Sequence, residues 1–375
     1  MVGGGQGALI GAVHRLAARM DDRYELVAGC FASDAERSRS SGAELGLAPE
    51  RVYASYGEMA AAERGRADAI DVVAIVTPNH LHLPVAAAFL DAGFHVICDK
   101  PLTTTVAEAE ELTRRVKESG RLFLLSHNYV AYPMVREARA LVAAGALGRL
   151  RVIQVEYPQD WLALPIEREG QKQAEWRTDP ARSGPGGTVA DIGTHAHNLA
   201  CFVGGLELVE LAADVNIHVP GRAIDDNVHA LLRFTDGVTG MLWASQVAPG
   251  NANALRLRVF GEKGGLTWAQ EDPGVLRLAM LGEAPRLISR GSPVAGPAAA
   301  RLTRLPDGCP EGFLEGFANF YGDAAELLWA RIEDRAPDPD AALLPTVKEG
   351  LDGMRFIEAV LASGRNNGAW TRLVQ

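Results

Sequence analysis

The residue types best suited to chemistry lie in one short stretch, Asp191-Ile192-Gly193-Thr194-His195. The apolar run 199–203 follows and stops at Gly204-Gly205, a pattern typical of a helix ended by glycine. Asp191 and His195 are four residues apart, so on a helix they share one face. A carboxylate beside an imidazole holds one ring tautomer and raises the ring's basicity. The pair therefore predicts a general base for a hydroxyl proton, although a helix cap followed by surface histidines explains this stretch alone equally well.

A glycine-rich turn near the N-terminus predicts a dinucleotide site. Gly3, Gly5 and Ala8 fit the spacing G-x-G-x-x-G/A, and an apolar helical pattern follows from Leu9. Glycines let the backbone approach a pyrophosphate on a helix N-terminus, so Gly5→Val is expected to weaken cofactor binding and leave the fold intact. Because only Met1-Val2 precedes the first glycine, we expect a truncated first strand or a misassigned start. The residues predicted to hold the pyrophosphate are Gly3, Gly5, Gln6, Gly7 and Ala8.

Apolar strand patterns alternate with helical ones through the first half of the chain. The predicted strands are 24–31, 69–76, 94–98 and 121–125, and the predicted helices are 35–45, 84–92 and 104–119. Strand 69–76 is apolar on both faces, as a parallel sheet requires. Such alternation predicts a doubly wound α/β sheet, which binds ligands beyond the carboxyl ends of its strands. Two of those ends carry polar residues, at 77–82 and at Asp99-Lys100-Pro101.

The motifs GGGQGA, TPNHLH, CDKPLTTT and DIGTHAHN, in this order, resemble the Gfo/Idh/MocA oxidoreductases, which include glucose–fructose oxidoreductase and inositol dehydrogenases. The resemblance covers nearly the whole chain, with Asp99 in place of the family's usual glutamate. It implies that Lys100 and His195 line the reacting carbon and that Asp191 holds the substrate or His195. It further implies a nicotinamide ribose bordered by the strand-end residues. The predicted cofactor contacts there are Thr77, Pro78, Asn79, His80, His82, Asp99 and Lys100.

The choice between NAD and NADP depends on the end of the second predicted strand. NAD-binding folds of this type usually place an acidic residue there, but Phe31 occupies the position, and a slip of register would be needed to use Asp34. Ser33, Arg37 and Arg39 could instead receive a 2′-phosphate, although both arginines are equally explained as solvated helix charges. We therefore expect NAD or NADP as the cofactor and assign Ser33 and Arg37 to its site.

Beyond residue 148 the pattern changes to long alternating strands. They cover 150–157, 206–219, 227–235, 238–247 and 254–260, with helices at 311–335 and 346–363 and a flexible segment at 290–310. Consecutive strands without helices predict an α+β domain with a large open, mostly antiparallel sheet. We thus expect a Rossmann domain at 1–148 and a substrate-binding and dimerisation domain at 149–375. The resemblance implies that the last helices pack back on the first domain and that the sheet pairs across a dimer.

A long loop is expected between Pro158 and Gly187. It contains Trp161, Trp176 and Arg177, and such residues suit a sugar, through stacking and paired hydrogen bonds. A loop that only contacts a second subunit is the alternative. The predicted substrate contacts are Lys100, Tyr129, Trp161, Trp176, Arg177, Asp191 and His195, and the predicted catalytic residues are Lys100, Asp191 and His195.

Composition limits the class of protein. The formal charge of −10 does not favour binding to nucleic acid, which usually requires a basic surface. No apolar run reaches the roughly 18 residues of a membrane span. The four cysteines are far apart, with no metal-ligand spacing, so we predict reduced thiols and no metal. Without a membrane span or a signal-peptide pattern, the expected location is cytoplasmic. The long alternating strands of the second half predict a homodimer or homotetramer.

These patterns favour an NAD(P)-dependent dehydrogenase that oxidises a secondary hydroxyl of a sugar, glycoside or cyclitol, or catalyses the reverse reduction. Two alternatives stay open. One is a glycosidase that uses NAD transiently for oxidation and elimination. The other is a regulatory nucleotide-binding protein without catalysis, against which the presence of Lys100, Asp191 and His195 argues.

Overall fold

The computed structural model describes residues 1–373 and divides the chain into two compact units. The first unit holds Met1–His127 and Phe317–Leu351, and the second holds Asn128–Gly316 and the chain from Asp352 onward. Most of α11 (Phe313–Ile332) belongs to the first unit and most of α12 (Val347–Arg365) to the second. The expected boundary after residue 148 falls in the second unit, because α6 (Pro133–Ala143) packs there against α9 (Thr194–Gly204) and α10 (Pro297–Ala300).

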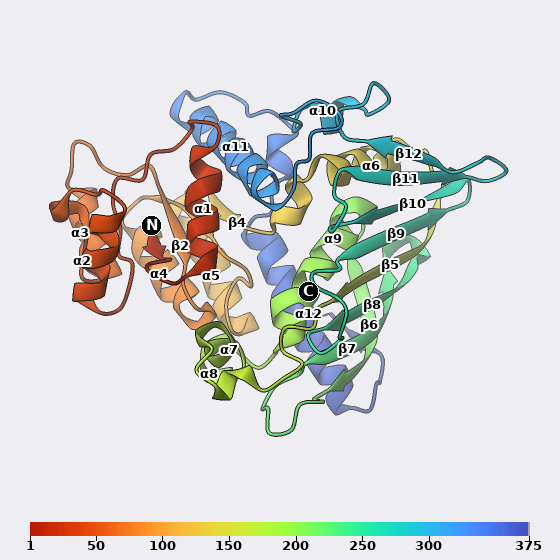
Figure 1. Ribbon diagram of the computed structural model, residues 1–375, viewed down its shortest axis with the longest axis horizontal. Coiled ribbons are helices and arrows are strands. Elements are labelled where there is room, and N and C mark those ends of the chain that lie inside the picture. Colours follow the sequence, from red (N-terminus) through yellow and green to blue (C-terminus); the bar gives the residue numbers. More distant parts are fainter. Residues whose placement is uncertain (374–375) are drawn as a thin grey trace. The chain divides into compact units, whose positions relative to one another are not determined.

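The first unit contains a parallel sheet with its strands in sequence order. These are β1 (Val2–Gly3), β2 (Val72–Val76), β3 (His95–Cys98) and β4 (Phe123–Leu125). Val73, Ile75 and Leu125 are fully buried, as expected of a sheet covered on both faces. The helices around it are α1 (Leu9–Arg19), α2 (Ala35–Glu44), α3 (Tyr56–Arg64), α4 (His82–Asp91) and α5 (Val106–Ser119) (Figure 1).

The predicted strand at 24–31 is wrong in extent. Only Gly29 and Cys30 make bridges, to Val52 and Val2. Cys30 exchanges backbone hydrogen bonds with residues 1 and 3, at 3.0 and 2.8 Å, and the flanking bonds, Met1 to the Ala28 oxygen and Gly5 to the Phe31 oxygen, belong to no further bridge. The neighbouring strand β1 spans two residues, so a ladder along 24–28 has no partner strand.

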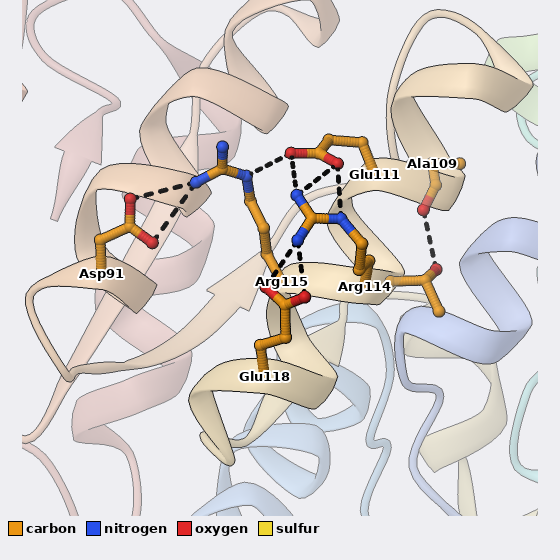
Figure 2. Close-up of polar contacts among 7 residues, drawn as sticks. Asp91, Ala109, Glu111, Arg114, Arg115 and Glu118 are labelled. Atoms are coloured by element: carbon orange, nitrogen blue, oxygen red, sulfur yellow. Dashed lines mark hydrogen bonds and ion pairs between the residues drawn. The ribbon is translucent and has the colours of Figure 1, made fainter.

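Helix α5 forms where its sequence predicts it. Thr105 accepts a hydrogen bond from the Glu108 backbone in a capping box, and Gly120 ends the helix with a φ of 65°. Figure 2 shows its outer face, where Arg115 joins Glu111 at 2.7 Å and Asp91 of α4 at 3.1 Å. Exposed pairs of this kind contribute at most about 1 kcal/mol each, so the apolar face of α5 contributes more to its docking.

The second unit is built on a nine-stranded sheet of order β12-β11-β10-β9-β5-β8-β7-β6-β13. Strands β5 and β8 pair in parallel and the other neighbours pair antiparallel, so the sheet is mixed but mostly antiparallel, as expected. The sequence analysis does not predict β10 to β13. The strands are β5 (Leu150–Pro158), β6 (Leu208–Asn216), β7 (Asn227–Phe234), β8 (Thr239–Ser245), β9 (Arg256–Gly261), β10 (Gly264–Ala269), β11 (Val275–Met280), β12 (Arg286–Ser289) and β13 (Thr371–Arg372).

The two faces of this sheet differ in what covers them. Helices α6 and α9 pack on one face, against strands β5 and β8 to β11 (Figure 1). Val228 of β7 is fully buried on that side. Leu231, Met241 and Phe260 are 56, 43 and 38% exposed on the other. The sheet thus presents apolar side chains that the described part of this chain does not cover.

Two segments expected to be irregular have structure of their own. The long loop after β5 contains α7 (Lys172–Arg177) and α8 (Pro180–Ser183). The segment 290–310, predicted to be flexible, contains α10 and is anchored by Arg290, which is 5% exposed and lies 2.8 Å from the Glu311 carboxylate. A buried ion pair therefore holds in place a segment for which composition alone predicts no fixed structure.

Candidate active site

The glycine-rich turn of the first unit forms a cradle at the start of α1. Gly3 and Gly7 have φ values of 81° and 75°, a region that glycine adopts without strain. Ala8 precedes α1 without capping it through a side chain, and the first turn carries no acidic residue. A pocket of about 390 Å³ opens here, and it is lined by Gly5, Gln6, Gly7, Ala8, Leu9, Ala12, Arg15, Ser41, Glu44 and Leu45.

This cradle fits a dinucleotide pyrophosphate. Uncapped N–H groups and the helix dipole favour an anion at the N-terminus of α1. The expectation that Gly5→Val leaves the fold intact is wrong, however, whereas the expected weakening of cofactor binding stays a prediction. A Cβ at Gly5 would lie 2.8 Å from both the Phe31 carbonyl oxygen and Ser41 Oγ, so a larger residue disturbs the fold as well as the pocket.

The end of the second predicted strand is arranged around a helix cap. Phe31 is 3% exposed, and the Asp34 carboxylate accepts a hydrogen bond of 2.8 Å from the Arg37 backbone as the N-cap of α2. A shift of register that brings Asp34 to a ribose would therefore have to compete with the role of the Asp34 carboxylate as the cap of α2. The side chains of Ser33 and Arg37 are exposed.

Among the polar residues after β2, His82 lies between two main-chain oxygens, and a neutral ring donates its single N–H to one of them. His82 is fully buried, with Nδ1 at 2.8 Å from the Pro101 oxygen and Nε2 at 3.0 Å from the Thr77 oxygen. Burial lowers the pKa of His82. The ring joins the loops after β2 and β3. Its predicted contact with the cofactor stays a prediction, as do those of Pro78 and the partly exposed His80.

Two observations after β2 fit a bound nicotinamide nucleotide. The Thr77 hydroxyl is buried and, within residues 1–373, has no hydrogen-bond partner. Asn79 is 6% exposed, in the short helical turn Asn79–Leu81. A buried hydroxyl without a partner costs free energy, and a ribose or amide group could satisfy it.

The segment Asp99–Pro101 follows β3 and carries the predicted lysine. Asp99 accepts a hydrogen bond of 2.6 Å from Ser126 and lies 3.6 Å from His14 Nε2. Burial raises the pKa of Asp99, but His14, Ser126 and Lys100 outweigh it and lower that pKa to about 2. Asp99 is therefore ionised beside Lys100, which is partly exposed and precedes a cis proline.

In the second unit, Asp191 and His195 lie on successive helical segments. Val189–Gly193 form a π-helical turn, and α9 continues from Thr194 to Gly204. The helix stopped by Gly205 is confirmed, but its first turn is wider than the α-helix expected. π-Turns occur often at functional sites, which is consistent with the chemistry predicted for this stretch.

The turn before this helix is held by a buried carboxylate. Asp225 accepts hydrogen bonds from the backbone N–H of Gly187 at 2.6 Å and of Val189 at 2.8 Å. Burial raises the pKa of Asp225 to about 6 despite these bonds, and the charge of Asp226 makes a smaller contribution in the same direction. A Cβ at Gly187 would lie 2.1 Å from the Asp225 carbonyl oxygen, so this close approach requires glycine.

The Asp191 carboxylate lies beside residues that the sequence assigned to substrate binding. Arg177 Nε is 3.4 Å from Asp191 Oδ2, and the guanidinium lies over the rings of Trp176 and Trp161, at 4.2 and 5.9 Å. Gln246 Nε2 donates to the same oxygen at 2.8 Å. The structure thus brings together four predicted site residues and adds one that the sequence analysis missed.

His195 is packed against a pair of tyrosines. It is 8% exposed, and its ring meets Tyr129 edge-on, with centroids 4.9 Å apart. Tyr129 is 4% exposed and its hydroxyl lies 2.5 Å from that of Tyr157, which donates to Asn253 at 2.7 Å. Burial raises the pKa of Tyr129 to about 12, so it stays protonated at neutral pH. Its predicted contact with substrate stays a prediction.

His197 has a different environment from His195. Its ring stacks on Phe356 with centroids 4.6 Å apart, and burial lowers its pKa to about 4. His197 is therefore a neutral core residue at physiological pH.

Residues 1–373 contain neither a metal-binding cluster nor a candidate membrane span. No group of three or more His, Cys, Asp or Glu side chains there could hold a metal ion. None of the helices in that range combines the length and the apolar character that crossing a membrane requires.

Known proteins resemble both units. Residues 1–127 match the model of an oxidoreductase family with an NAD-binding Rossmann fold, and residues 135–267 match that of the GFO/IDH/MocA C-terminal domain. The Bacillus subtilis oxidoreductase YfiI is 32% identical over 99% of this chain and 95% of its own. A crystal structure of an oxidoreductase from Sinorhizobium meliloti is 51% identical, with a TM-score of 0.89 over 99% of this chain and 98% of that one.

A third relative was crystallised with ligands. The inositol dehydrogenase homolog of Azotobacter vinelandii, in complex with NADH and myo-inositol, is 32% identical, with a TM-score of 0.91 over 99% of this chain and 96% of that one. The fold agrees with these matches, and the chain belongs to the Gfo/Idh/MocA family of NAD-binding oxidoreductases.

Proposed function

We propose that this oxidoreductase acts on a secondary hydroxyl of a sugar, glycoside or cyclitol, oxidising it or reducing the corresponding ketone. The observation that carries the proposal is the cluster around Asp191, in which an arginine whose guanidinium lies over two tryptophan rings meets a carboxylate. Tryptophan faces bind the C–H surface of a ring, and charged side chains bind its hydroxyls. The Azotobacter relative, crystallised with myo-inositol, supports this substrate class.

The proposed roles follow from residue chemistry. His195 takes the hydroxyl proton, and Asp191 supports it by holding the ring or the substrate. Lys100 donates a hydrogen bond to the substrate oxygen and relays the proton. The alternative assignment makes Lys100 the base. When bound, the nicotinamide accepts or donates the hydride, and the protein supplies orientation and proton handling.

The remaining proposed contacts divide between the two units. The contacts proposed for the cofactor are Gly3, Gly5, Gln6, Gly7, Ala8, Ser33, Arg37, Thr77, Pro78, Asn79, His80, His82, Asp99 and Lys100. Tyr129, Trp161, Trp176 and Arg177 belong to the substrate. A second copy of the chain is the proposed partner of the exposed sheet face, giving a homodimer or homotetramer.

A cofactor-dependent absorbance assay at about 340 nm tests the proposal. A panel of sugars, glycosides and cyclitols is offered with NAD and with NADP, and the ketones with the reduced forms. Net formation or consumption of reduced cofactor with at least one polyol or ketone is expected. Release of aglycone from a glycoside without net reduced cofactor would instead identify transient oxidation and elimination. Activity with neither class would contradict the proposal.

A further inference from the structure

We propose that Gln246 is a positioning residue that fixes the Asp191 carboxylate for catalysis, and that Thr188 sets the orientation of the Gln246 amide. This inference rests on the proposed function and deepens it, because it assigns a role to residues outside the predicted site.

The contacts of Gln246 are complementary at both ends of its amide. Nε2 donates to Asp191 Oδ2 at 2.8 Å, and Oε1 accepts from Thr188 Oγ1 at 3.0 Å. Gln246 is 2% exposed and Thr188 fully buried, so water does not compete freely for these groups. An ionised carboxylate only accepts hydrogen bonds, so it selects the NH₂ end of the amide, and the Thr188 hydroxyl selects the other.

The backbone around this pair is fixed to one edge of the sheet. Gln246 follows β8, and its backbone N–H bonds the Asp226 oxygen at 3.0 Å, one step beyond the β7–β8 pair Asn227–Ser245. The adjacent Asp225 binds the turn at 187–189 that carries Thr188. The two strand ends therefore hold both the amide and the turn from which Asp191 projects.

The geometry at Asp191 shows what the amide contributes. Gln246 and Arg177 both contact Oδ2, so neither contact takes up Oδ1. Arg177 on α7 contacts this carboxylate, and the charge of Asp191 helps to raise the pKa values of Tyr129 and Tyr157, whose rings pack against His195. Gln246 adds a donor without adding a charge. It therefore orients the carboxylate while leaving the electrostatic balance among those groups unchanged.

Substitutions of matched size separate orientation from packing. Gln246→Leu removes the donor and is expected to lower kcat about 10- to 100-fold, the usual value of a hydrogen bond to a charged group. Thr188→Val is nearly isosteric and is expected to lower kcat by about 3- to 10-fold. In both variants the dissociation constant of NADH, which the first unit binds, should stay within about twofold of the wild-type value.

Gln246→Glu provides a readout that packing alone does not move. Two carboxyl groups this close share a proton, and the upper apparent pKa of the pair rises. Below that pKa, the introduced carboxyl group is protonated and donates to Asp191 as the amide does, so activity is retained. Above it the two charges repel. The kcat profile should therefore gain a falling alkaline limb that the wild-type profile lacks.

Direct titration of Asp191 separates this inference from the proposed function. Carbon-13 NMR of carboxyl-labelled aspartate, with the Asp191 signal assigned through Asp191→Asn, should show in Gln246→Glu an additional titration step at the upper apparent pKa of the pair, which the wild type lacks. This measurement needs no substrate, so it stands even if the polyol panel fails. An unchanged Asp191 titration, or a wild-type kcat in Gln246→Leu, would overturn the inference.

Discussion

At the scale of single residues, the candidate site combines groups that the sequence revealed with groups that it could not. Asp191, His195 and Arg177 were predicted because their types and spacing carry chemistry. Gln246 and Thr188 were not, because Gln246 lies at the end of an apolar strand pattern and meets Asp191 only through the fold. The position of Gln246 at the end of a buried strand was the one signal available in the sequence, and it does not indicate that Asp191 is the partner of Gln246.

His197 should matter for stability and not for catalysis. His197→Ala removes a buried ring from Phe356 and is expected to lower the free energy of unfolding by about 2–4 kcal/mol. Its kcat should stay within about threefold of the wild-type value, since burial holds the pKa of His197 at about 4 and away from proton transfer near neutral pH. Urea unfolding and steady-state kinetics on the same preparation measure both quantities. A kcat loss of 100-fold or more (roughly the lower bound for general base catalysis) in a folded variant would place the base at the wrong histidine.

Arg37 should discriminate between cofactors. Its exposed guanidinium follows the Asp34 cap of α2 and can pair with a 2′-phosphate, which NAD lacks. Arg37→Ala is expected to weaken NADP by about 10-fold, the value of one charge-assisted hydrogen bond, and to leave NAD unchanged. Calorimetric titration with each cofactor measures the two dissociation constants. Arg114→Ala is the control, since Arg114 lies on α5 and pairs with Glu111 and Glu118. Equal weakening of both cofactors by Arg37→Ala would make Arg37 a general surface charge.

At the scale of secondary-structure elements, continuous apolar runs and capping signals were the reliable predictors. Strands β2 to β4 and helix α5 follow directly from them. Strand β10 was missed because it begins with Gly264 and Gly265, which also belong to the turn signal after β9. The π-helical turn at 189–193 was missed because hydrophobic periodicity does not distinguish it from the first turn of an α-helix, and the carboxylate that binds its start lies far along the chain.

The turn before α9 should make stability depend on pH. The folded-state pKa of Asp225 is raised to about 6, so between about pH 4 and 6 the folded protein holds a proton that the unfolded chain has released. Stability therefore falls as pH rises through this window, by up to about 3 kcal/mol from this group. Asp225→Asn removes that contribution. Between pH 4 and 6, the unfolding free energy of the wild type should fall by this amount relative to that of the variant. A difference constant with pH would show that Asp225 keeps an ordinary pKa.

At the scale of the whole molecule, the uncovered face of the nine-stranded sheet is the feature that one chain does not explain. Leu231 and Met241 pair across β7 and β8 and are about half exposed. Contiguous apolar patches of this kind mark association surfaces. The wild type is expected to sediment as a dimer or tetramer at micromolar concentration, and the double variant Leu231→Glu, Met241→Glu as a monomer. Leu281→Glu, on a residue 83% exposed just beyond β11, is the control and should not change the assembly. A monomeric wild type would refute the proposed partner.

The central claim is that His195 and Lys100 act together as the proton-handling groups of one reaction. The most direct test compares kcat and NADH affinity for the wild type, His195→Ala, Lys100→Ala and the double variant. Each single substitution should lower kcat by about 10²–10⁴-fold and leave the NADH dissociation constant nearly unchanged. The double variant should lose less than the product of the two, because residues that act as a unit are not additive. A His195→Ala variant with wild-type kcat, or fully multiplicative losses, would contradict the account.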